Sequence, residues 1–290
     1  MYVPPSPLCI GIGTLTSLST APRQLPLLSE LGFEGFQLVT RTSFDGVDLA
    51  DIAARVEGHR IHALGIYGNT LTDAALREDL VKLIGHASMF GTQIVSCFAG
   101  AHEDRPVDEN IPLWAQTFGE LGRIAADHGV TLAFENCAMG GTWERPHVNI
   151  AHSPRAWEMM FDALPDAPLA LEWEPCHQIC SFVEPLAQLR KWLPRIARMH
   201  GKDAQVHHER VREVGILSGE YVIHHRFPGF GDTNWHHIFT ILGMAGWTGA
   251  IDIEGYHDPV YRGDLEMTGQ VASLRALQSA RGGDYVPNPV

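Results

Sequence analysis

The feature that most constrains the fold is the regular alternation of short β-branched segments with longer amphipathic segments along the whole chain. This alternation is typical of βαβ units, in which helices join parallel strands. Segments with the length and composition of buried strands occur at 8–14, 35–39, 61–66, 93–98, 131–136, 169–174, 197–200 and 250–254. Helical patterns occur at 74–90, 112–128, 153–164 and 234–244, with capping residues at Asp73, Ser153 and Asn234. Eight strands with interleaved helices predict an α/β fold, a closed (β/α)8 TIM barrel.

One barrel domain is expected to cover residues 1–290, because no linker or low-complexity tract divides the chain. Two segments are longer than the loops and helices of a barrel alone require. Residues 204–232, rich in His, Arg and Gly, are expected to form a long loop of the kind that serves as a lid or binding segment. Residues 257–290 are expected to form an extension that contains a loop and one helix.

The charge balance argues against nucleic acid and anionic membranes as partners. The chain has 21 Lys and Arg against 34 Asp and Glu, which gives a formal net charge of −13. Both of those partners attract basic surfaces. No segment approaches the roughly 20 apolar residues of a spanning helix, and the N-terminal residues lack a secretory signal pattern. A cytoplasmic location is therefore expected, with the five scattered Cys reduced.

Four predicted strands end in a potential metal ligand: Glu135, Glu174, His200 and Glu254. In a TIM barrel the carboxyl ends of all strands meet at one face, so these side chains should converge there. A single Glu at a strand end is more often an ion-pair or capping group, but four together are harder to explain in that way. Three carboxylates and one imidazole predict an oxygen-rich divalent site for Mn(II), with Mg(II) or Co(II) as alternatives.

The segment Glu172-Trp173-Glu174-Pro175-Cys176-His177 contains two candidate glutamates. Residues two apart on a strand point the same way, so Glu172 and Glu174 should both face the barrel interior. Glu174 lies nearer the mouth and is the expected ligand. Glu172 is expected to contact a metal ligand without binding the metal itself, and His177 is expected to orient a ligand or a bound water.

The motifs FEN, EPCH, HGKD, HRFPGFGD and IEGYHD occur in this order over more than half of the chain. This set resembles the xylose isomerase-like superfamily of sugar isomerases and epimerases. The resemblance implies the same four metal ligands, with His177 as the site histidine. One departure is that Glu174 stands where the family usually has Asp. The segments MHGKDA and IDIEGYHDPVYRGDLEMTGQ resemble the large subunit of C-glycoside deglycosidases.

The ligand set predicts proton abstraction beside a metal-bound carbonyl, followed by an enediolate. Glu135 and Glu254 are the expected base and acid. Lys202 and Arg226 are expected to bind substrate oxygens, although an ion pair is an equally good explanation for Lys202. Trp143 and His102 are expected to line the pocket, although large aromatics at a barrel mouth are more often packing residues.

The predicted function is a metal-dependent sugar isomerase or epimerase that takes a small carbohydrate and forms a homo-oligomer. One alternative is a lyase on a 3-keto sugar, either an inosose dehydratase-like enzyme or a deglycosidase large subunit with a small partner subunit. An apurinic endonuclease-like hydrolase fits less well, because its three-zinc site needs more His and Asp ligands than can be placed here. A binding protein without catalysis is the remaining alternative, and metal analysis would separate it from the others.

Overall fold

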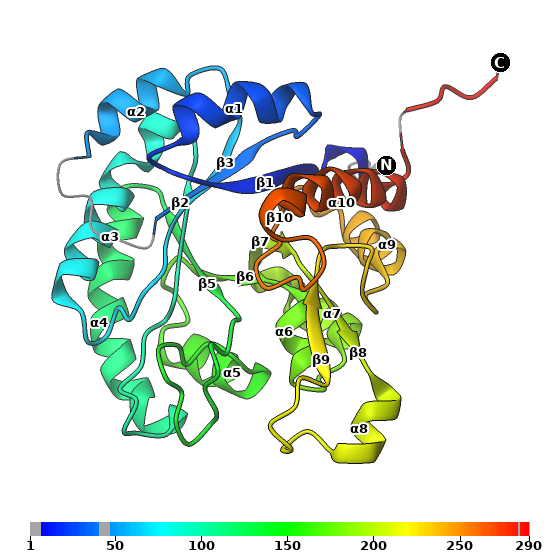
Figure 1. The fold of residues 1–290 in the computed structure, drawn as a ribbon. Coiled ribbons are helices and arrows are strands. Elements are labelled where there is room, and N and C mark those ends of the chain that lie inside the picture. Colours follow the sequence, from blue (N-terminus) through cyan, green and yellow to red (C-terminus); the bar gives the residue numbers. More distant parts are fainter. Residues whose placement is uncertain (1–6, 41–46, 284, 290) are drawn as a thin grey trace.

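The computed structural model describes residues 7–40, 47–283 and 285–289, and these form the predicted barrel. Eight parallel strands close in the order β1-β10-β7-β6-β5-β4-β3-β2 (Figure 1). They are β1 (Gly11–Ser17), β2 (Phe36–Thr40), β3 (Ile61–Ile66), β4 (Ile94–Cys97), β5 (Thr131–Glu135), β6 (Leu169–Trp173), β7 (Ile196–Gly201) and β10 (Ala250–Ile253). Each predicted strand is present, and β1 starts later than expected because a 3-10 turn occupies Pro7–Cys9. The barrel prediction is confirmed.

Helices cover the outside of the barrel. They are α1 (Ala21–Glu30), α2 (Leu49–Arg55), α3 (Ala74–His86), α4 (Val107–Asp127), α5 (Pro154–Ala163), α6 (Pro175–Cys180), α7 (Pro185–Trp192), α9 (Trp235–Ala245) and α10 (Glu266–Arg281). Short 3-10 turns also occur at Ala87–Phe90, Leu193–Arg195 and Gly263–Leu265. The predicted caps are confirmed, because Asp73, Ser153 and Asn234 each accept a hydrogen bond from a first-turn amide. No helix among the described residues is long and apolar enough to cross a membrane.

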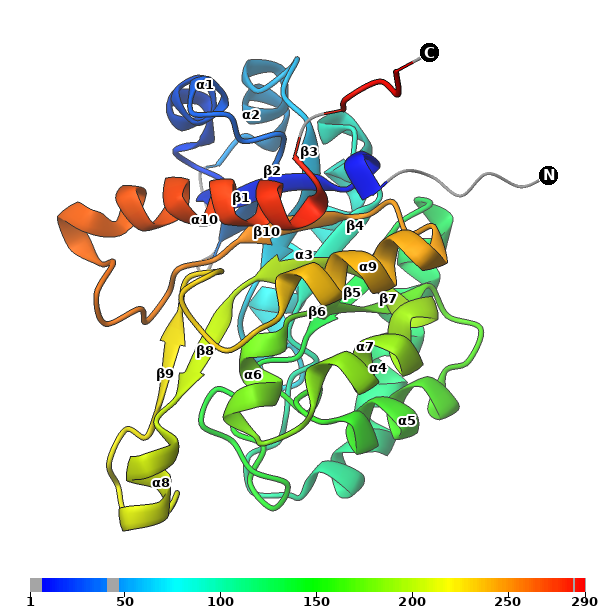
Figure 2. The ribbon, with the colours of Figure 1, turned by 90° about the vertical axis from the view of Figure 1, so that its right-hand side faces the viewer.

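Residues 204–232 were expected to form a long loop and instead contain most of an antiparallel hairpin. Strands β8 (Asp203–Val206) and β9 (Ile223–Arg226) pair with each other, and α8 (His208–Val214) lies between them. The hairpin and α8 project away from the barrel in both views (Figures 1 and 2). Only Lys202 separates β7 from β8, so the barrel strand runs almost directly into the hairpin.

A buried aspartate anchors the base of this hairpin. The Asp203 carboxylate accepts hydrogen bonds from the amides of Ala204 (2.8 Å) and Thr233 (3.0 Å) and from the indole of Trp235 (3.1 Å). A Cβ on Gly231 would lie 2.4 Å from this carboxylate, so only glycine allows the chain to pass here. The return of the chain from β9 to α9 therefore depends on contacts of Asp203.

Candidate metal centre

The four strand-end residues converge at the mouth of the barrel. Ligand atoms of Glu135, Glu174, His200 and Glu254 all lie within 4.8 Å of one another, and all four side chains are buried. Glu135 is the last residue of β5 and His200 the penultimate residue of β7, while Glu174 and Glu254 directly follow β6 and β10. Three carboxylates and one imidazole from four strands therefore surround one point.

Buried asparagines fix the backbone of two of these residues. Asn136 accepts a hydrogen bond from the Glu174 amide at 2.7 Å and donates one to the Glu174 carbonyl at 3.0 Å. Asn149 donates to the carbonyl of Glu135 at 2.9 Å. The first two bonds join the residue after β5 to the residue after β6, and the third joins the end of β5 to the loop before α5, so side-chain hydrogen bonds fix the backbone at both carboxylates.

The cluster contains buried polar atoms that lack hydrogen-bond partners. They are both carboxylate oxygens of Glu174, Nδ1 of His200 and Oε2 of Glu254. His200 Nδ1 lies 3.3 Å from Glu135 Oε1 and 3.0 Å from Glu254 Oε2, but not in hydrogen-bond geometry. Orphaned buried groups are costly, and a bound cation would satisfy all of these atoms at once. The residues therefore fit a divalent metal.

The pKa values of the cluster indicate how much negative charge is confined there. Burial, with a contribution from the nearby Glu254 carboxylate, raises the pKa of both Glu135 and Glu174 to about 7. Burial also acts on Glu254, but the Lys202 ammonium, whose Nζ lies 2.6 Å from Oε1, holds its pKa well below the usual range. A divalent cation would allow all three carboxylates to ionise together.

Glu172 lies below this cluster and binds other protein groups. Its carboxylate accepts hydrogen bonds from Tyr67 (2.5 Å), Ser96 (2.7 Å) and Gln37 (2.9 Å), and pairs with Arg198 at 2.7 Å. Although burial opposes ionisation, His200 and Arg198 lower the pKa of Glu172 to about 2. A carboxylate with this many partners is poorly placed to be a ligand itself.

Gln37 connects Glu172 to the imidazole of the cluster. The Gln37 carbonyl oxygen lies 2.8 Å from His200 Nε2, while its amide nitrogen donates to Glu172. This arrangement places a proton on Nε2 and directs Nδ1 towards Glu135 and Glu254. Glu172 therefore supports the orientation of His200 through Gln37.

From this arrangement we expect Glu172→Gln to weaken binding of Mn²⁺ by about 10- to 100-fold without abolishing it. This is the usual loss of metal affinity when a residue that orients a ligand is replaced. Titration with Mn²⁺, monitored by the electron paramagnetic resonance of the free ion, measures the change. The exposed Glu158→Gln provides the matched control. Complete loss of metal in Glu172→Gln together with normal binding in Glu174→Gln would reverse the assignment of the two glutamates.

His177 lies next to the cluster, with Nε2 2.6 Å from Glu174 Oε1. Burial, together with the nearby Lys202 ammonium, lowers the pKa of His177 to about 3. The imidazole is therefore neutral near pH 7 and can accept or donate a hydrogen bond beside Glu174.

The other predicted site residues lie at different places. Lys202 is buried and reaches Glu254 rather than the neighbouring Asp203. Arg226 binds Asp258 (3.1 Å) and Gln205 (2.8 Å), so it ties the hairpin to the segment after β10. The Trp143 ring stacks under Arg155 at 4.0 Å, which accounts for this aromatic by packing. The backbone of His102 is held by hydrogen bonds with the Asn110 side chain.

The site also uses residues that the sequence analysis did not select. Besides Gln37 and Tyr67, a buried ionic pair lies deeper in the barrel, where Arg198 binds Asp252 as well as Glu172. Asp252 in turn lies 2.8 Å from His62. The available signal was a polar residue within an otherwise apolar strand, as in FQLVT and AIDI.

A closed parallel barrel with carboxylates and a histidine converging at its carboxyl-terminal mouth defines a class of TIM-barrel proteins. The family model for the xylose isomerase-like TIM barrel matches residues 25–279, and the chain belongs to this family. The resemblance of the sequence motifs to the xylose isomerase-like superfamily is thus confirmed.

Similar proteins include a dehydratase and two epimerases. Inosose dehydratase of Bacillus thuringiensis (strain Al Hakam) is 23% identical over 223 residues, which cover 69% of this chain and 70% of the relative. The 3-keto-D-glucoside 4-epimerase from E. coli superimposes with a TM-score of 0.69 at 14% identity, covering 93% of this chain and 99% of that one. An L-ribulose 3-epimerase superimposes with a TM-score of 0.68 at 16% identity, covering 94% and 96% of the two chains.

Proposed function

We propose that this protein is a divalent metal-dependent sugar epimerase or isomerase that removes a proton from the carbon beside a carbonyl. The observation that carries the proposal is the convergence of three buried glutamates and one histidine, with orphaned atoms facing one another. Glu135, Glu174, His200 and Glu254 would hold the metal. The oxygen-rich donor set favours Mn(II), with Mg(II) or Co(II) as alternatives. When bound, such an ion supplies a Lewis acid that makes the neighbouring C–H more acidic.

The residues around this point have the properties that proton transfer requires. Glu135 is buried within the cluster, and a bound cation would keep its carboxylate ionised, which is the form that accepts a proton. Glu254 stays ionised beside Lys202 and comes from a different side of the barrel, where it faces the other side of the substrate. Lys202 offers its remaining donors to a substrate oxygen, and the neutral His177, whose Nε2 lies 2.6 Å from Glu174 Oε1, orients that ligand.

A second candidate function is elimination from a keto-sugar or keto-cyclitol. The inosose dehydratase relatives favour it, because their similarity extends over 69% of the chain. Elimination begins with the same proton abstraction but then expels a leaving group instead of returning the proton. The deglycosidase form of this alternative also requires a small partner subunit.

We expect the metal-loaded protein to exchange a substrate C–H with deuterium from heavy water when it is given a ketose or keto-sugar that it binds. The reason is that Glu135 would share its acquired proton with solvent before returning it. Nuclear magnetic resonance of free ketoses, keto-inositols and 3-oxo-glycosides, each incubated separately, measures the exchange and the product.

The products separate the candidates. An inverted or shifted centre with an intact carbon skeleton supports the epimerase or isomerase. Loss of water from a keto-inositol, or release of an aglycone from a 3-oxo-glycoside, without turnover of ketoses would replace it with elimination. Absence of deuterium exchange with ketoses, keto-inositols and 3-oxo-glycosides alike would reject both functions.

A further inference from the structure

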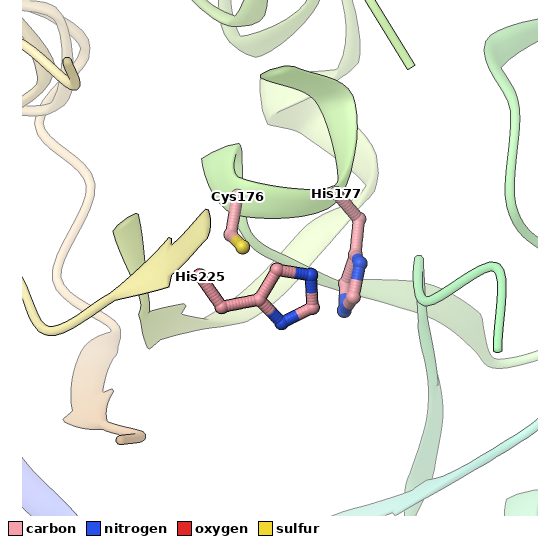
Figure 3. Close-up of side chains that lie close together, drawn as sticks. All are labelled: Cys176, His177 and His225. Atoms are coloured by element: carbon pink, nitrogen blue, oxygen red, sulfur yellow. The ribbon is translucent and has the colours of Figure 1, made fainter. Parts of the chain in front are cut away.

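A group of sulfur and imidazole donors lies beside the candidate metal centre and is separate from its four residues. Cys176 and His177 are on α6, and His225 is on β9 of the projecting hairpin. Figure 3 shows the sulfur and the two rings grouped together between these elements. One donor atom from each of the three residues lies within 4.8 Å of the others.

Two of these three donor residues are buried and the third is partly buried. Cys176 is fully buried and His177 is 7% exposed. The rings of His177 and His225 meet edge to face with centroids 5.2 Å apart. Nδ1 of His225 is buried and has no hydrogen-bond partner, which is a costly arrangement unless something else binds it. The Cys180 thiol, one turn along α6, interacts with both Cys176 and His225.

The donor chemistry differs from that of the neighbouring centre. Thiolate and imidazole are the ligands that zinc takes in tetrahedral sites, whereas three carboxylates suit manganese or magnesium. Zn–N and Zn–S distances of about 2.0 to 2.3 Å place tetrahedral ligands roughly 3.5 Å apart, so the three donors need only a small inward movement. Glu174, 2.6 Å from His177 Nε2, stands where a carboxylate orients a metal-binding histidine.

We propose that Cys176, His177 and His225 form a second metal site, for a zinc-type cation, that fastens the β8–β9 hairpin to the barrel mouth. Binding forms a metal–sulfur bond and releases the thiol proton of Cys176 to solvent. Cys180, which interacts with Cys176 and His225, lies next to this site. Neither the sugar chemistry nor the occupancy of the neighbouring centre is needed for this site to bind metal.

The test uses Co²⁺ as a spectroscopic substitute for zinc. The full chain is reduced, freed of metal, supplied with one equivalent of Mn²⁺ and then titrated with Co²⁺. We expect a thiolate-to-cobalt charge-transfer band that saturates at about one equivalent per chain. Cobalt that displaces manganese from the four-residue centre cannot produce this band, because that centre has no thiol.

Variants assign the band to particular residues. Cys176→Ser should abolish it, and His225→Gln should weaken cobalt binding by more than about 100-fold, beyond the effect of a supporting residue. Cys137→Ser and the exposed Cys9→Ser should keep the band. His225 is only partly buried, so its replacement carries little risk for folding, and circular dichroism checks each variant.

The same measurements can overturn the proposal. It fails if the unchanged chain shows no band, or if the band persists in Cys176→Ser. It also fails if His225→Gln binds cobalt normally, or if Cys137→Ser loses the band, since Cys137 also lies near His177.

Discussion

His200→Ala is expected to remove nearly all bound Mn²⁺, with a loss of affinity greater than the 10- to 100-fold of a supporting residue. Glu254→Gln should have a comparable effect. Each residue contributes a donor that points at the centre of the cluster and has no hydrogen-bond partner there, so nothing else in the chain replaces it. Metal content after dialysis, measured by mass spectrometry, checks the result.

Two exposed residues of α8 serve as matched controls for these variants. His208→Ala and Glu209→Gln make the same substitutions far from the barrel mouth and should leave metal content unchanged. The far-ultraviolet circular dichroism of all four variants should remain that of the parent protein. Stoichiometric metal in both His200→Ala and Glu254→Gln would show that the centre is elsewhere.

Arg198→Met is expected to destabilise the fold by about 3 to 5 kcal/mol, the usual cost of removing one partner from a buried ionic group. Arg198 is fully buried and pairs with two carboxylates, Glu172 and Asp252, which would then lose the cation that they share. For a chain of this size the loss lowers Tm by roughly 6 to 20 °C. Differential scanning calorimetry measures the shift.

The control for this change is Lys191→Met, because Lys191 forms an exposed pair with Glu158. Exposed pairs contribute at most about 1 kcal/mol, so its Tm should hardly move. Equal Tm values for the two variants would mean that the carboxylates below the metal centre do not depend on Arg198.

The sequence predicted the barrel well because each strand is a local pattern. Segments such as 61–66 are short, apolar and followed by a capped helix, and these signals do not depend on distant residues. The convergence of Glu135, Glu174, His200 and Glu254 followed from fold class alone, since a barrel gathers its strand ends at one face.

The remaining features depend on contacts between distant residues or on weak local signals. Gln37 meets Glu172 across 135 positions, and Asp252 meets His62 across 190, so no local pattern reveals either pair. The hairpin strands β8 and β9 were missed because each is only four residues long, and β9 (IHHR) is half-buried throughout without the alternation of a strand. The contacts of Arg226 with Asp258 and Gln205 likewise lie outside its own strand, and its role in binding substrate stays a prediction.

The buried ionic group of Arg198, Glu172, Asp252 and His62 also limits which substitutions can accumulate during evolution. Replacing Arg198 alone removes the cation that two buried carboxylates share, and replacing Asp252 alone leaves both Arg198 and His62 with one contact fewer. Residues in direct contact have coupled energies, so a substitution tolerated with its compensating partner is not tolerated alone. Among descendants these positions should therefore covary, whereas the apolar positions around them can drift one at a time.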